Sequence, residues 1–176
     1  PVPNLGQLFG QSGPYGDRTD TTIIAPPIQT QTRIEASGKP ARLALSKLRL
    51  DPGQPRKLLP AHLAEQVHGG GLDLPSALAA WAESLNIPLR ATYDPDSEGA
   101  GEGGAGRFNR IRQLAATILS DGLINPITAI EEGQGLYRVE TGERRTLAHA
   151  WLAACGLSEY ESVPAWVVDG AIRKRT

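Results

Sequence analysis

The stretch Thr141-Gly142-Glu143-Arg144-Arg145 opens a predicted helix and places two arginines in its first turn. Thr141 is the expected N-cap. A helix N-terminus carries partial positive charge and unpaired N–H groups, so arginines are unfavourable there unless an anion lies between them and the backbone. We therefore expect a phosphate site in which Gly142 lets the backbone approach the ligand and both guanidinium groups bind its oxygens. The alternative is a pair of exposed arginines on an ordinary surface helix.

The helix prediction rests on apolar residues that recur at helical spacing, with Gly156 as a stop signal after the last of them. They are Leu147, Ala148, Trp151, Leu152 and Cys155.

The composition fits one ordinary domain: 176 residues, of which 40% are hydrophobic and 21% are charged. Because the N-terminus lacks the features of a signal peptide and no apolar run could cross a membrane, we expect a cytoplasmic protein without a membrane partner. The net charge of −1 excludes a globally basic nucleic-acid-binding protein. The absence of methionine, even at position 1, predicts that the chain is a fragment or lacks its true start.

The N-terminal half divides by composition. Residues 1–40 are rich in Gly, Pro, Gln and Thr and predict a flexible arm. Residues 41–50 predict a strand followed by a turn of helix, and 51–56 a turn-rich loop. Two short helices are expected at 60–67 and 74–86, the second of them capped by Asp73.

Residues 94–106 are acidic and then glycine-rich, which predicts a mobile linker. A helix is expected from Phe108 to about Gly122, and strands at 126–130 and 136–140 joined by a hairpin loop at 131–135. A last strand is predicted at 163–168, followed by a polar tail at 171–176.

Several of these segments, in this order and spacing, closely resemble the N-terminal domain of the ParB family. The matching segments are Gln54-Pro55-Arg56, residues 114–118 with Gly122, residues 125–127, residues 137–145 with Ala148, and Val163-Pro164. The resemblance covers about residues 41–57 and 107–168. It implies an α+β ParB/sulfiredoxin-like domain over residues 41–170, with a small mixed sheet flanked by helices and a helical insertion at about 58–106.

Members of this family bind CTP, hydrolyse it slowly, and close as dimers into a clamp around DNA. The resemblance implies that Gly142, Glu143, Arg144 and Arg145, preceded by Thr141, bind the triphosphate of CTP or another nucleoside triphosphate, with Mg²⁺ as its companion. Arg144 and Arg145 would also govern the DNA-loading switch, and Glu143 is the candidate catalytic residue for slow hydrolysis.

The remaining implied nucleotide contacts lie elsewhere in the chain. Gln54 and Arg56 match positions that contact the nucleotide, and Thr117 replaces a family serine while keeping its hydroxyl. The implied partners are DNA, a second copy of the full-length protein, and a ParA-like ATPase bound through the arm. The implied setting is the nucleoid, in chromosome partition or in plasmid and mobile-element maintenance.

The family's Glu-Asn motif and helix-turn-helix fall beyond Thr176. We therefore expect weak DNA binding without sequence preference, through phosphate contacts of Arg107, Arg110 and Arg112.

Two other functions stay open. A metal-dependent ParB-like nuclease would need clustered carboxylates, and the candidates are Glu140 and Glu143 near the motif, with Asp94, Asp96 and Glu98 in the linker. A non-enzymatic protein-interaction domain would use the arginines to hold carboxylates of a partner.

Sulfiredoxin activity is disfavoured because Glu143 occupies the position of its catalytic cysteine, and Cys155 fits the core better than a nucleophilic role. The histidines predict no zinc site.

Overall fold

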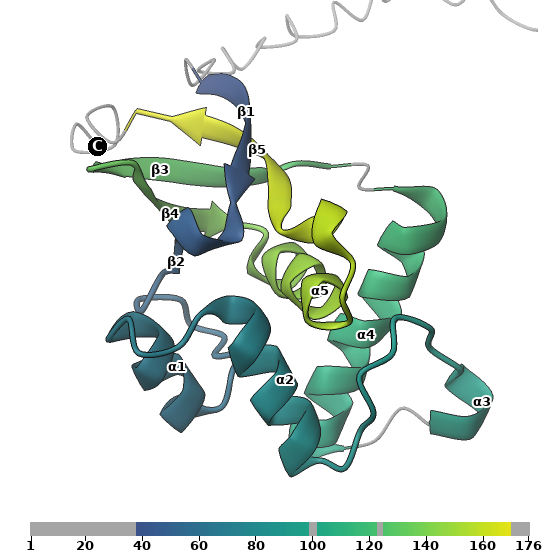
Figure 1. Ribbon diagram of the computed structural model, residues 1–176. Coiled ribbons are helices and arrows are strands. Elements are labelled where there is room, and N and C mark those ends of the chain that lie inside the picture. The colour runs from purple at the N-terminus through teal and green to yellow at the C-terminus, as the bar shows by residue number, and fades with distance from the viewer. Residues whose placement is uncertain (1–37, 99–101, 123–124, 170–176) are drawn as a thin grey trace, which may run out of the picture. The chain divides into compact units, whose positions relative to one another are not determined.

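The computed structural model describes residues 38–98, 102–122 and 125–169 (Figure 1). The polar tail at 171–176 and the arm as far as residue 37 lie outside the described residues. The first strand, β1 (Gly38–Ala44), includes the last three residues of the expected arm, 38–40. It is part of a five-stranded sheet with the order β1-β5-β3-β4-β2.

The sheet is mixed, as the sequence predicted. β5 (Ser162–Val168) pairs antiparallel with β1 and parallel with β3 (Ile127–Gly133). β4 (Leu136–Thr141) pairs antiparallel with β3 and parallel with β2 (Leu48–Leu50). A 3-10 helix over Leu45–Lys47 joins β1 to β2. The sequence did not predict β2, because three residues are too few to display the alternation of a strand.

The β3–β4 hairpin is tighter than expected. The connection has two residues, Gln134 and Gly135, whose φ angles of 55° and 69° are both positive. Positive φ at both central residues is typical of a type I′ turn, whose twist matches that of the flanking strands. The predicted five-residue loop at 131–135 is therefore wrong, and residues 131–133 extend β3.

The helices are α1 (Ala61–His68), α2 (Leu74–Ser84), α3 (Pro95–Glu98), α4 (Gly103–Asp121) and α5 (Glu143–Ala154). Asp73 caps α2 as predicted, since its Oδ1 accepts a hydrogen bond of 2.8 Å from the backbone N–H of Ser76. The α+β class, a small mixed sheet flanked by helices, is thus confirmed.

The linker predicted at 94–106 is wrong over most of its length. It contains α3 and the first turn of α4, and Gly106 is buried. Glycine weakens a helix, but packing of Phe108 and Ile111 in the following turn outweighs that propensity. Residues 99–101, within the predicted linker, lie outside the described residues.

The core joins the sheet to α5, which lies beside α2 and α4 (Figure 1). The Phe108 ring meets Trp151 at 5.2 Å and Trp81 at 4.9 Å between centroids, both in edge-to-face geometry. These three residues come from α4, α5 and α2, so the segment expected as an insertion contributes α2 to the same core. Aromatic pairs of this kind add about 0.5–1.5 kcal/mol each to the burial of their surface.

Candidate functional site

The turn from β4 into α5 is built on Gly142. Its φ of 98° lies in the left-handed region, and a Cβ there would lie 2.8 Å from Ile127 Cγ2 and 3.3 Å from Ile127 Cα. Gly142 is itself the N-cap of α5. The prediction that Thr141 is the cap is wrong: the chain turns at the glycine, so Thr141 stays in β4 and pairs with Thr128.

The N-terminus of α5 keeps unused donors. No side chain caps it, and its first backbone hydrogen bond runs from Thr146 N to Gly142 O at 2.9 Å. The N–H groups of residues 143–145 therefore precede the helical hydrogen-bond ladder. Together with the partial positive charge of the helix end, these donors favour an anion.

The two arginines of this turn play different roles. Arg145 Nη1 donates a hydrogen bond of 3.1 Å to the carbonyl oxygen of Pro126, which joins α5 to the residue before β3. Arg144 is exposed, and within the described ranges it makes no hydrogen bond or ion pair. Arg144 is therefore the cation of this turn that is available to a ligand.

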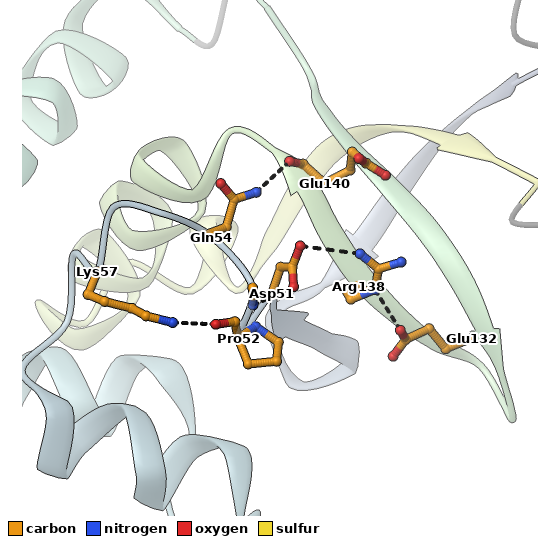
Figure 2. A network of polar contacts seen from close by, with 8 residues as sticks. Asp51, Pro52, Gln54, Lys57, Glu132, Arg138 and Glu140 are labelled. Carbon is orange, nitrogen blue, oxygen red and sulfur yellow. Dashed lines mark hydrogen bonds and ion pairs between the residues drawn. The ribbon is translucent and has the colours of Figure 1, made fainter. Parts of the chain in front are cut away.

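The loop after β2 is attached to β4 (Figure 2). Gln54 Nε2 donates a 2.9 Å hydrogen bond to the carbonyl oxygen of Glu140. At the start of the loop, Asp51 Oδ2 lies 3.4 Å from Arg138 Nη1, and the same arginine makes an ion pair of 2.7 Å with Glu132 through Nε. The Gln54–Glu140 and Asp51–Arg138 contacts join residues that are 86 and 87 positions apart in the chain, and they bring the loop to the N-terminus of α5.

Glu143 is the first residue of α5, and its carboxyl group contacts the loop at Leu58. Burial raises the pKa of its carboxyl group above the ordinary value of 4.5, and the nearby Asp51 carboxylate raises it further. The Lys57 ammonium group and a hydrogen bond with the Leu58 backbone act in the opposite direction and lower this pKa. The carboxyl group thus holds the loop against the first turn of α5.

A pocket of ≈ 370 Å³ opens where the loop, α4 and α5 meet. Its lining residues are Gln54, Arg56, Leu58, Leu114, Gly142, Glu143, Arg144 and Arg145. The structure therefore brings together six of the eight residues that the sequence proposed for nucleotide binding. This volume falls within the usual range for small-molecule sites, about 300–1,000 Å³.

Two of the proposed residues do not line this pocket. Thr117 is exposed on α4, and its hydroxyl donates a 3.1 Å hydrogen bond to the carbonyl oxygen of Gln113, in its own helix. Thr141 is exposed at the end of β4. Sequence reasoning missed the apolar lining residues Leu58 and Leu114. Leu114 belongs to the helix expected from Phe108 and to the matching segment 114–118, and no sequence signal distinguishes Leu58, which follows the turn-rich loop.

Arg112 is not a surface residue. It is 1% exposed, and its guanidinium lies 5.7 Å from the Trp151 ring centroid and 5.4 Å from that of Tyr93. The expectation that it contacts DNA phosphates is wrong, because its side chain enters the core with the apolar face of α4. Arg107 and Arg110 are exposed.

Cys155 and His149 pack against the core. Burial raises the pKa of the half-buried Cys155 thiol to about 11, so the thiol stays protonated near neutral pH and is a poor nucleophile. His149 Nδ1 lies 3.1 Å from the Ser162 carbonyl oxygen, and burial lowers the pKa of its imidazole.

The described part of the chain contains no group of three or more His, Cys, Asp or Glu side chains placed to hold a metal ion. Of the helices that the structure describes, none has the length and apolar character needed to span a membrane.

No protein-family model matches the chain, and no curated protein matches it either. Among solved structures, the chain is similar to the C-terminally truncated chromosome-partitioning protein ParB from Caulobacter crescentus, complexed with CTP-gamma-S. The identity is 18% and the TM-score 0.37. The similarity covers 75% of this chain and 45% of the other, so this chain spans less than half the length of that protein.

Proposed function

We propose that this chain is a nucleotide-binding module that binds CTP, or another nucleoside triphosphate, at the N-terminus of α5. The observation that carries the proposal is the convergence of the uncapped N–H groups of α5 with Arg56 and Arg144 around one pocket. Backbone N–H groups and guanidinium groups make charge-assisted hydrogen bonds to phosphate oxygens, and the helix end adds favourable charge.

The other pocket residues suit the rest of a nucleotide. Leu58 and Leu114 supply apolar surface on which a sugar or base can pack. One N–H of the Gln54 side-chain amide donates to the Glu140 carbonyl oxygen, so its second N–H and its amide oxygen remain for hydrogen bonds with a ligand. The choice of CTP comes from the resemblance of the motifs to the ParB family.

Mg²⁺ is compatible with this donor set. Mg²⁺ in nucleotide sites is commonly held by one or two carboxylates together with phosphate oxygens, and Glu143 supplies a carboxylate to the pocket. When bound, the ion would neutralise part of the phosphate charge.

The wider role proposed is that of a nucleotide-gated DNA clamp in partition or in plasmid and mobile-element maintenance. DNA, a second copy of the full-length protein and a ParA-like ATPase are its proposed partners. This role is supported by the order and spacing of the motifs from residue 110 to 168.

Arg144→Ala should weaken binding of a nucleoside triphosphate about 10- to 100-fold, because a hydrogen bond to a charged group contributes roughly 1.5–3 kcal/mol. Isothermal titration calorimetry with CTP and ATP measures the effect. Lys47→Ala is the matched control, because it removes an exposed cation that does not line the pocket. Unchanged affinity in Arg144→Ala would contradict the site. Binding of an acidic peptide in place of both nucleotides would favour the protein-interaction alternative.

Glu143→Gln should leave stability at neutral pH unchanged or slightly higher. Because the pKa of Glu143 is raised in the folded protein, its protonated form is favoured there, so the group costs stability as pH rises above its ordinary pKa of 4.5. The amide avoids this cost and can still accept the hydrogen bond from Leu58. Urea denaturation of both proteins from pH 4 to pH 8 measures the difference, which should grow in favour of the variant as pH rises.

The same variant tests the catalytic role proposed for Glu143. If Glu143 activates water, Glu143→Gln should abolish CTP hydrolysis while nucleotide affinity stays within a few-fold of the original value. Full hydrolysis in the variant would leave Glu143 with the role of holding the loop.

A further inference from the structure

A second cavity, of ≈ 380 Å³, opens beside the nucleotide pocket and is lined almost wholly by cations. Its lining residues are Arg56, Lys57, Leu58, Arg107, Arg110 and Arg144. Arg56, Leu58 and Arg144 also line the nucleotide pocket, so the two cavities adjoin. Among the described lining residues there is no carboxylate, although the whole chain has a net charge of −1.

Helix α4 supplies two of the arginines that line this cavity. Arg107 and Arg110 are three residues apart and share the exposed face of the helix, whereas Phe108 and Ile111 lie in the core. Lys57, which follows the loop after β2, also lines the cavity and donates a hydrogen bond to the carbonyl oxygen of Pro52 (Figure 2).

The arginines around the cavity are not neutralised within the described part of the chain. Arg56, Arg107, Arg110 and Arg144 make no hydrogen bond or ion pair there. Like charges that face one cavity repel one another, and an anion with several charged oxygens relieves the repulsion. Guanidinium groups match phosphate oxygens in bidentate geometry, so the fitting ligand is a phosphate chain.

We propose that Arg107 and Arg110 bind the terminal phosphate of the bound nucleoside triphosphate and make the site selective for triphosphates over monophosphates. The inference rests on the proposed nucleotide site. Leu58, Leu114 and Gln54 accommodate the base and sugar, and the N-terminus of α5 binds the first phosphates. The phosphate chain then passes Arg56 and Arg144, which border both cavities, and ends against α4.

The experiment compares CTP, CDP and CMP by calorimetry on the full chain and on Arg107→Gln/Arg110→Gln. Lys39→Gln/Lys47→Gln is the control, because it removes the same charge from two exposed cations outside both cavities. The substitutions are on the surface, and circular dichroism verifies folding. We expect the α4 double variant to lose about 10- to 100-fold in CTP affinity, with CMP affinity unchanged and the control like the original protein.

Equal losses for CTP and CMP, or no loss for CTP, would overturn the assignment of the terminal phosphate. So would a double variant that loses affinity for duplex DNA and keeps its affinity for CTP, because α4 would then contact the DNA backbone. If the original chain binds no nucleotide, the proposed function fails, and inorganic tripolyphosphate becomes the probe. Tripolyphosphate binding that the α4 double variant abolishes supports the cation cavity as a polyphosphate site, and absence of that binding refutes it.

Discussion

Trp151→Ala should lower the free energy of unfolding by about 3–5 kcal/mol, the usual cost of deleting a fully buried aromatic side chain. Trp151 is 0% exposed, and its ring centroid lies 5.2 Å from that of Phe108 and 5.7 Å from the Arg112 guanidinium. The substitution leaves a cavity where α4 and α5 meet, and it removes an aromatic surface from a buried charged group. A domain of this size has a total stability of roughly 5–15 kcal/mol, so much of it should be lost.

Urea denaturation followed by far-UV circular dichroism measures the effect. Trp166→Ala is the matched control, because it deletes the same side chain at a position that is 40% exposed. Its cost should be about 1 kcal/mol or less. Similar losses in the two variants would mean that the α2–α4–α5 aromatic cluster is not the centre of the core.

Gly142→Ala should lower the free energy of unfolding by about 2–5 kcal/mol. A left-handed conformation costs an L-residue about 1–2 kcal/mol, and forcing extra atoms into a packed site costs about 1–3 kcal/mol. Both terms apply, since Gly142 has a φ of 98° and its missing Cβ would meet Ile127 Cγ2 at 2.8 Å. The Ile127 side chain has little room to move away from an added Cβ, because it is fully buried in β3.

Gly156→Ala separates the cost of the left-handed conformation from the cost of the contact with Ile127. Its φ of 90° is close to that of Gly142, but no atom lies within 4 Å of the position of its missing Cβ. Gly156→Ala should therefore show only the conformational cost, and thermal unfolding of the two variants side by side gives the contribution of the Ile127 contact. Equal effects would show that Ile127 moves aside at no cost.

The sequence predicted the elements whose signals are local and periodic. Leu147, Trp151 and Leu152 are buried on α5 as their spacing indicated, and Asp73 caps α2. Local patterns failed where tertiary contacts decide the outcome. Because of tertiary packing, α4 begins at Gly103, within a glycine-rich stretch. The tight turn at Gly142 leaves Thr141 in β4.

The candidate site was predictable only in part for the same reason. Gln54, Arg56 and the residues of the 142–145 turn come together as their motifs implied. The arginines of α4 could not be sorted from sequence, because Arg110 and Arg112 are two residues apart and yet one is exposed and the other is buried. The orientation of α4 about its own axis, which places Arg112 against Trp151, determines which arginine is buried.

The site depends on the weakest pairing of the sheet. β2 has three residues and is the outermost strand of the sheet on the side of β4. Because β2 and β4 are parallel, both strands finish at the same end of the sheet, where the loop after β2 and helix α5 begin. Short edge elements open locally at a lower free energy than the rest of a domain. Detachment of β2 would separate Gln54 and Arg56 from Arg144 while β1, β5, β3 and β4 remain paired. A ligand that bridges these residues stabilises the closed state by mass action, so site occupancy and β2 docking are thermodynamically linked.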